Sequence, residues 1–168
     1  MAISTQQVKD LRDQCGAGVM ECRGALVAAE GDINKAMAIL KEKGLLKAKK
    51  SENRATAQGL IEAYIHTGGR VGAIVEIKCE TDFVARTDEF KQLAHDLAMQ
   101  VTACPPQYIS PEEVPPGAAD VDPQTACLFA QPFIKDPAKT VKDRVVEVIA
   151  KTGENIRVTR FSRFELGS

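Results

Sequence analysis

Cys79 and His66 are the residues whose types most readily suggest chemistry, because a histidine base can activate a cysteine nucleophile. The two residues could face one another across a predicted hairpin. Nothing in the surrounding sequence supplies a group to orient the base or to build an oxyanion site. The second histidine, His95, lies beside the apolar stripe of a predicted helix and is expected to be solvated or partly packed. We therefore predict that the chain is not an enzyme, and keep a small cysteine enzyme that uses Cys79 as an alternative.

Phosphate-binding and metal-binding patterns are also missing from the sequence. There is no GxxxxGK[ST] loop, and Gly16-Ala17-Gly18 is not followed by the glycine spacing of a dinucleotide-binding loop. The cysteines form an odd set without a CxxC pair, which favours neither a zinc site nor a disulfide framework; they are Cys15, Cys22, Cys79, Cys104 and Cys127. We expect no cofactor, no metal and mostly buried, reduced thiols. A disulfide through Cys104 or Cys127, between subunits, is the alternative.

The segment Thr81-Asp82-Phe83-Val84-Ala85-Arg86 is the unusual feature of the chain. It lies between the end of a predicted strand and the start of a predicted helix. An exposed Phe83 beside Asp82 would combine an apolar wedge with a negative charge on a structured base, which suits insertion into a partner's cleft. Val84 is instead expected to pack under the hairpin, and Thr81 to cap a short turn. Composition alone leaves a structural and a functional interpretation of this segment equally open.

Residues 1–46 are predicted to form three short helices. Ser4 and Gln7 form a capping-box pattern at the start of the first helix, and Asp32 is a suitable N-cap for the third. Gly44 is predicted to end the third helix as a left-handed C-cap. Three helices of this length bury only a small core, so we expect a module of marginal stability. Residues 47–54 are polar and basic and are predicted to be a solvated linker.

Residues 55–168 are predicted to form an α+β core domain. Segments 60–66 and 71–79 are rich in β-forming residues and are separated by the turn Thr67-Gly68-Gly69-Arg70, which predicts a hairpin. Segment 156–164 is a third predicted strand. Two amphipathic helices, one beginning near Thr87 and one capped by Thr140, are expected to cover one side of a small antiparallel sheet of about three strands.

All eight prolines lie between Pro105 and Pro137, so residues 105–130 are expected to be a connector with little regular structure. The apolar stretch 126–133 should dock against the core, because it is too hydrophobic to remain exposed.

Composition limits the classes of partner. The chain has 168 residues and a net charge of -1, without the basic excess that nucleic-acid binding relies on. It has no Trp and two Tyr, so stacking platforms for bases are scarce. No signal sequence and no run approaching about 18 apolar residues is present, which favours a cytoplasmic protein that contacts neither membrane nor nucleic acid directly.

Several ordered motifs together resemble the elongation factor Ts family over nearly the whole chain. They are Leu11-Arg12, Gly16-Ala17-Gly18-Val19-Met20-Glu21-Cys22, Tyr64-Ile65-His66, Thr81-Asp82-Phe83-Val84-Ala85-Arg86, Gln131-Pro132-Phe133, Gly153-Glu154-Asn155-Ile156 and Arg163-Phe164-Glu165-Leu166-Gly167. The resemblance implies a guanine-nucleotide exchange factor whose partner is elongation factor Tu. It also implies that the N-terminal helices form a domain like the ubiquitin-associated domain.

The resemblance further implies roles for particular residues. Phe83 would wedge between the partner's side chains and Asp82 would disturb its magnesium and phosphate contacts, with Thr81 and Val84 holding the loop in place. Three residues of the N-terminal module match positions that dock on the partner: Leu11, Val19 and Met20. Short members of the family resemble half of the long members' core, so a homodimer is expected.

This sequence departs from the family pattern at several points. Cys15 stands where the family usually has Thr, and Val19 where Met is common. The proline-rich stretch 105–127 replaces a charged helical stretch, and the long members' second core half is missing. A peptide-binding adaptor built on the N-terminal helices, without exchange activity, is the main alternative, but it would leave Asp82 and Phe83 unexplained.

Overall fold

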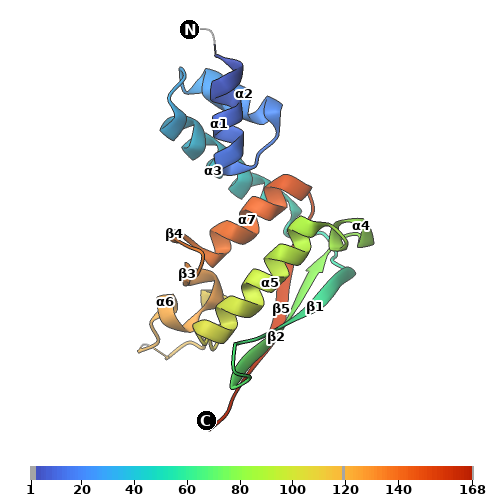
Figure 1. Cartoon of the computed structure of the whole chain (residues 1–168). Helices are drawn as coiled ribbons and strands as arrows, with labels where there is room; N and C mark the ends of the chain where they lie inside the picture. The colour runs from blue at the N-terminus through green and yellow to red at the C-terminus, as the bar shows by residue number, and fades with distance from the viewer. Residues whose placement is uncertain (1–2, 119, 168) are drawn as a thin grey trace.

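The computed structural model describes residues 3–118 and 120–167. A bundle of three helices stands at one end of an α+β core (Figure 1). The bundle contains α1 (Thr5–Cys15), α2 (Val19–Ala28) and α3 (Ile33–Ser51). Its small core confirms the expectation of limited burial and consists of Val8, Leu11, Cys22, Ala25, Leu26, Ala29 and Ala36.

The predicted helix starts in the bundle are confirmed. The Ser4 hydroxyl accepts a hydrogen bond from the Gln7 amide at 3.2 Å, while the Gln7 side chain accepts one from the Ser4 amide at 3.0 Å. This capping box satisfies N–H groups that the first turn would otherwise leave unpaired. Gly16 ends α1 with a φ of 65°, a left-handed conformation that glycine adopts without steric cost. Asp32 caps α3 by accepting from the Lys35 amide.

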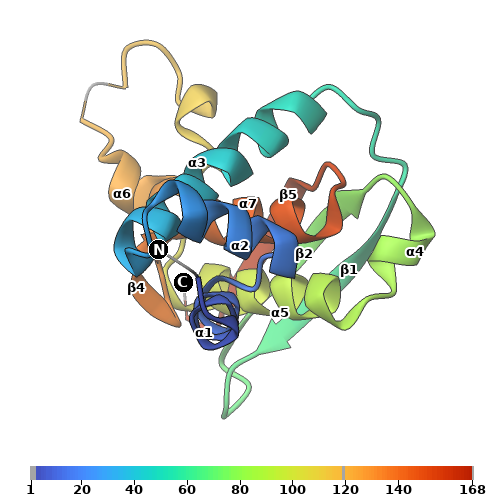
Figure 2. The same ribbon diagram turned by 90° about the horizontal axis from the view of Figure 1, so that it is seen from above.

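The predicted end of the third helix at Gly44 is wrong. α3 continues to Ser51, so residues 47–51 of the predicted linker are helical. Gly44 is buried against α7 (Val141–Thr152), where a Cβ atom would lie 3.5 Å from Val146 Cγ1 and 3.6 Å from Ala150 Cβ. Gly44 therefore lies inside a helix that packs on α7, with ordinary contact distance left for a methyl group, and does not end the helix. In Figure 2, α3 runs from the bundle over the core towards the start of the first strand.

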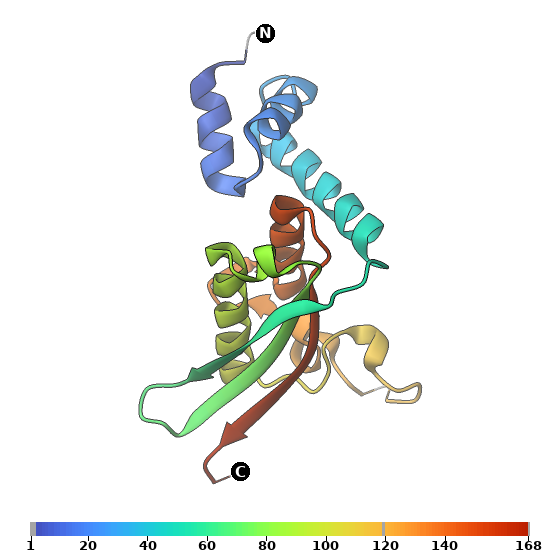
Figure 3. The same cartoon turned by 90° about the vertical axis from the view of Figure 1, so that its right-hand side faces the viewer.

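The core sheet has the order β1-β2-β5 and is antiparallel throughout, as predicted. Its strands are β1 (Gln58–Ile65), β2 (Val71–Cys79) and β5 (Arg157–Glu165). α5 (Asp88–Ala103) and α7 lie on one side of it (Figure 3), which confirms the predicted fold class. Alternate residues of β2 face these helices in the main core, which includes Ala73, Val75, Ile77, Cys79, Phe90, Leu93, Leu97 and Val148.

The proline-rich connector contains short elements. These are two 3₁₀ turns (Pro111–Glu113 and Leu128–Ala130) and α6 (Pro123–Ala126). After the connector comes a small hairpin of β3 (Pro132–Phe133) and β4 (Asp136–Thr140) that the sequence did not predict. Leu128 and Phe133 are buried, so the apolar stretch docks as expected.

The buried Gln131 fixes this docking. Its amide donates to the Cys104 and Thr125 carbonyls at 3.1 and 2.8 Å and accepts from Gln100 of α5. Cys127 is buried, so it is not available for the suggested bond between subunits, whereas Cys104 is exposed. Among the described residues, no helix is long and apolar enough to cross a bilayer.

Candidate partner-binding site

The segment Thr81–Arg86 forms a single helical turn, α4 (Asp82–Ala85), that projects from the edge of the core (Figures 1 and 2). Thr81 is its N-cap, as predicted: the Thr81 hydroxyl accepts from the Val84 amide at 3.4 Å. At the other end the Thr87 hydroxyl donates to the Val84 carbonyl at 2.7 Å and accepts from the Phe90 amide. The turn is thus fixed between two caps, one of which also starts α5.

The turn divides its apolar residues between core and solvent. Val84 is 6% exposed and packs into the main core, whereas Phe83 is 79% exposed. Asp82 lies next to Phe83 and pairs with Arg86 at 2.8 Å, with both side chains largely exposed. An ion pair this exposed adds little to stability. The result is an apolar ring and a carboxylate presented to solvent on an ordered turn.

Glu154, far away in sequence, holds the start of this turn. One carboxylate oxygen of Glu154 accepts from the backbone amides of Glu80 and Thr81 at 3.1 and 3.0 Å. The other accepts from the Thr81 hydroxyl at 2.6 Å. These bonds to an ionised acceptor are stronger than bonds between neutral groups. Glu154 therefore positions the residue that caps α4.

Asn155 extends this support to the chain leaving α3. The Asn155 side-chain amide donates to the Glu52 and Arg54 carbonyls at 3.1 and 2.9 Å, and its backbone amide donates to the Glu80 carboxylate at 2.6 Å. Arg54 also donates to the Glu80 carboxylate and to the Gly153 carbonyl. The turn of residues 153–155 thus ties together the end of β2 and the connection from the bundle.

Sequence reasoning did not assign these supporting roles. The motif Gly153-Glu154-Asn155-Ile156 contributed to the family resemblance, but no role was predicted for Glu154 or Asn155; Gly153 is the C-cap of α7, with a φ of 74°. The available sequence signal was that Glu154 and Asn155, a carboxylate and an amide, directly follow a helix C-cap. Nothing in the sequence identified the groups that they bind.

The structure contradicts a Cys79–His66 pair. The His66 amide donates to the Val71 carbonyl, so His66 lies at the opposite end of the hairpin from Cys79, eight residues away along β2. At about 3.3 Å per residue this separation is roughly 26 Å. Burial raises the pKa of the Cys79 thiol to about 11, and the negative charge of Glu154 adds to this increase. Cys79 instead donates to the Thr81 carbonyl at 3.1 Å and supports the α4 turn.

His95 is partly packed, as expected. It contacts the Glu62 carboxylate at 3.1 Å and meets the Tyr64 ring edge-on. Within residues 3–118 and 120–167, no group of three or more His, Cys, Asp or Glu side chains is arranged to hold a metal ion.

The N-terminal module presents a second apolar surface. Val19 and Met20, at the start of α2, are exposed, and Val27 is exposed further along the same helix. Leu11, by contrast, has no exposed surface and packs in the small core of the bundle. Leu11 can therefore affect binding only through the shape of the module. Both α2 and α4 lie towards the same end of the core (Figures 1 and 3).

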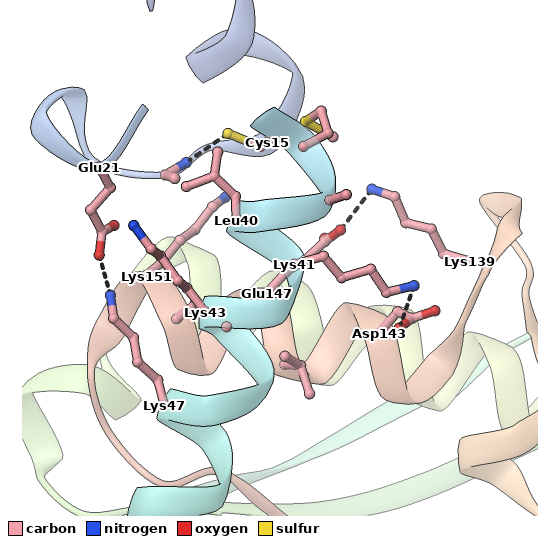
Figure 4. A pocket seen from close by; sticks show the side chains of 16 residues that line it. Cys15, Glu21, Leu40, Lys41, Lys43, Lys47, Lys139, Asp143, Glu147 and Lys151 are labelled. Atoms are coloured by element: carbon pink, nitrogen blue, oxygen red, sulfur yellow. Dashed lines mark hydrogen bonds and ion pairs between the residues drawn. The ribbon is translucent and has the colours of Figure 1, made fainter. Parts of the chain in front are cut away.

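A groove between α3 and α7 separates the bundle from the core (Figure 4). Its apolar lining includes Met37, Leu40, Gly44, Val146 and Ala150. Lysines along its rim bind carboxylates: Lys41 pairs with Asp143 at 3.0 Å, Lys139 with Glu147 at 2.7 Å, and Lys47 with Glu21. The ion pair of Lys41 links α3 to α7 and so joins the bundle to the core, whereas that of Lys47 links α3 to α2 within the bundle.

Comparison with known proteins identifies the family. A family model described as Elongation factor TS matches residues 8–122. The chain is 46% identical to "Elongation factor Ts" of Carboxydothermus hydrogenoformans, covering 98% of this chain and 89% of that protein. It is 45% identical to the protein of the same name from Thermotoga neapolitana, covering 99% and 98%, and 45% identical to that of Herpetosiphon aurantiacus over the full length of both.

The alignments with the first two relatives extend over 194 positions, whereas this chain has 168 residues, so the relatives contain residues that this chain lacks. The matched region includes the exposed Asp82-Phe83 pair as well as Val19 and Met20. The chain belongs to the elongation factor Ts family.

Proposed function

We propose that this chain is a guanine-nucleotide exchange factor for elongation factor Tu and promotes the release of its GDP during translation elongation in the cytoplasm. The observation that carries the proposal is the exposed Phe83 beside Asp82 on a turn that is capped at both ends. Because this projection is already ordered, little conformational entropy is lost when it binds a partner.

The mechanism requires no bond to be made or broken. Phe83 enters a cleft of the partner and displaces side chains there, while the Asp82 carboxylate disturbs the contacts that hold magnesium and phosphate. An exchange protein binds nucleotide-free elongation factor Tu more tightly than nucleotide-bound elongation factor Tu. Because the coupling is reciprocal, its binding weakens the affinity for the nucleotide by the same ratio. Thr81 and Val84 act through the turn: Thr81 caps it and Val84 anchors it in the core.

The N-terminal module supplies a separate contact. Val19 and Met20 are exposed on α2, in the bundle that stands at the end of the core where α4 lies, and an apolar patch of this kind suits burial against a partner domain. Two separated contacts on one partner strengthen binding through effective concentration. Leu11 supports this surface from inside the bundle.

We also propose that the chain forms a homodimer through the uncovered face of its sheet. Ile61, Ile65, Ile74 and Phe164 are exposed there, and the strand register places Ile65 and Phe164 on either side of Gly72. A contiguous apolar face is the type of surface that a second copy would bury.

Light scattering after gel filtration should give twice the chain mass, and Ile61→Thr with Phe164→Ser should give a monomer. Leu46→Ser is the matched control, because Leu46 is an exposed apolar residue on α3; this variant should stay dimeric. A monomeric wild type would contradict the proposal.

Stopped-flow release of fluorescent GDP from elongation factor Tu tests the exchange function. The wild-type chain should accelerate release, Phe83→Ala should reduce this acceleration strongly, and Leu46→Ala, which also truncates an exposed apolar side chain, should not. If the wild type binds elongation factor Tu without accelerating release, the chain is an adaptor and the proposed exchange function is wrong. If Phe83→Ala matches the wild type, exchange occurs without the wedge.

A further inference from the structure

Two cysteines face one another across the turn between α1 and α2. Cys15 is the last residue of α1 and Cys22 lies in the first half of α2, and their sulfur atoms are 3.7 Å apart. Cys15 is partly exposed and lies at the end of the groove shown in Figure 4, whereas Cys22 is buried. Neither thiol has a part in the proposed exchange mechanism.

The connection between them is short and adaptable. Gly16 and Gly18 flank Ala17, and Gly16 has a φ of 65°. The Ala17 amide donates to the Cys15 sulfur at 3.4 Å, and the Cys22 thiol donates to the Ala17 carbonyl at 3.7 Å. A disulfide needs a sulfur–sulfur distance of about 2.05 Å. Two side-chain rotations and a small shift of a glycine-flanked turn can supply the remaining approach, because glycine permits backbone changes that other residues resist.

We propose that Cys15 and Cys22 are a modification site at which a peroxide forms an intramolecular disulfide. The Cys15 thiolate attacks one peroxide oxygen, the O–O bond breaks, and hydroxide leaves; with hydrogen peroxide as the oxidant, the cysteine becomes a sulfenic acid. The Cys22 sulfur then attacks the Cys15 sulfur, the S–O bond breaks, and the departing hydroxide takes the Cys22 proton as water. Overall, two thiols lose two protons and two electrons, and one hydrogen peroxide becomes two waters.

The environments of the two thiols set this order. Burial raises the pKa of Cys22 to about 11, and its contact with Cys15 adds to the increase, so Cys22 remains protonated and shielded at neutral pH. Cys15 is partly exposed, whereas Cys22 is buried, so Cys15 is the sulfur that a dissolved oxidant reaches. Cys22 is already in contact with Cys15, so it can resolve the sulfenic acid without any large movement.

The bond would fix the turn that leads directly into Val19 and Met20. It also lies beside the core, since the Lys151 side chain of α7 packs on Gly16. An effect of oxidation on partner binding rests on the proposed function, whereas the formation of the bond does not. Detecting the Cys15–Cys22 disulfide directly therefore tests its formation independently of partner binding.

The sequence makes the chemical test direct. Trypsin cleaves after Arg12 and Arg23, so residues 13–23 form one peptide that contains both cysteines. The folded full-length chain is treated with hydrogen peroxide, denatured, alkylated and digested. We expect this peptide to lose two hydrogens, to take up no alkylating reagent, and to recover two alkylation sites after reduction with dithiothreitol.

Variants identify the order of the steps. In Cys22→Ala, which keeps the buried position apolar, Cys15 should accumulate as a sulfenic acid that dimedone traps. In Cys15→Ser, Cys22 should remain a free thiol. Exposed Cys104 is an internal reference for oxidation without a resolving partner. The proposal is overturned if peroxide leaves both cysteines of the wild-type peptide open to alkylation, or if Cys15 proceeds to sulfinic acid while Cys22 stays a thiol. The wild-type result decides the matter even if a variant fails to fold.

Discussion

Replacing Glu154 with Gln tests whether the exposed Asp82-Phe83 turn works because it is held rigidly. Glu154 accepts three hydrogen bonds, two from the backbone amides of Glu80 and Thr81 and one from the Thr81 hydroxyl. A glutamine keeps the shape of the side chain but has no charge and only one acceptor oxygen. If that oxygen faces the two backbone amides, the NH₂ group meets the Thr81 hydroxyl, which must turn its hydrogen away; in the opposite orientation the NH₂ group faces both amides. In either orientation the bonds lose the carboxylate charge, and the Thr81 hydroxyl or the two amides lose their acceptor.

The size of the effect follows from these bonds. A hydrogen bond to a charged group is worth about 1.5–3 kcal/mol, and the exposure of Thr81 places this case towards the lower limit. A loss of about 2 kcal/mol corresponds to a change of roughly 30-fold in an equilibrium constant. We therefore expect the rate of GDP release from elongation factor Tu to fall by roughly 10- to 30-fold at equal factor concentration.

Two assays separate support from contact. Stopped-flow GDP release gives the functional effect, and hydrogen exchange at the Glu80 and Thr81 amides reports directly on the turn; both amides should exchange faster in Glu154→Gln. Glu42→Gln is the matched control, because Glu42 is exposed on α3. A rate of GDP release with Glu154→Gln within twofold of the wild-type rate, together with strong impairment of Phe83→Ala, would refute the positioning role of Glu154. That result would leave the role of Phe83 as a wedge intact.

Three stability predictions test the packing and the electrostatics. Gly44→Ala should raise the free energy of unfolding by about 0.5–1 kcal/mol, because the added methyl meets α7 at ordinary contact distance and alanine favours helix; a fall on chemical denaturation would contradict this packing. Leu97→Ala should lower it by about 2–5 kcal/mol, since Leu97 is fully buried, and the exposed control Leu166→Ala should change it little. The hydrogen bond from Lys47 holds the pKa of Glu21 below its ordinary value of 4.5. A carboxylate with a lowered folded-state pKa stabilises the fold above its unfolded pKa and loses this effect as the pH falls through the folded value. The difference in melting temperature between wild type and Glu21→Gln should therefore be constant near neutral pH and shrink below about pH 4.5, and a difference that persists at pH 2–3 would contradict this role.

Local sequence patterns were sufficient for most element boundaries and for the cap and the buried residue of the α4 turn. Capping residues such as Ser4, Thr87 and Thr140 act on amides three residues away, so their effect is readable from the chain. The alternation of β2 and the stripe of α5 likewise report which face is buried. In the α4 turn, the burial of Val84 and the cap at Thr81 were predicted, whereas the sequence left open whether Phe83 is buried or exposed.

Contacts between distant segments could not be predicted in this way. α3 passes Gly44 because α7 packs against that glycine, which overrides its local tendency to end a helix.

The sequence by itself determined that Asp82 and Phe83 lie on a capped turn between a strand and a helix, since caps, alternation and helical periodicity all depend on near neighbours. Their exposure became clear only in the structure. Tertiary structure alone decided what holds that turn, because Glu154 reaches Thr81 from 73 residues away. That contact exists only when the end of α7 is folded beside the end of β2.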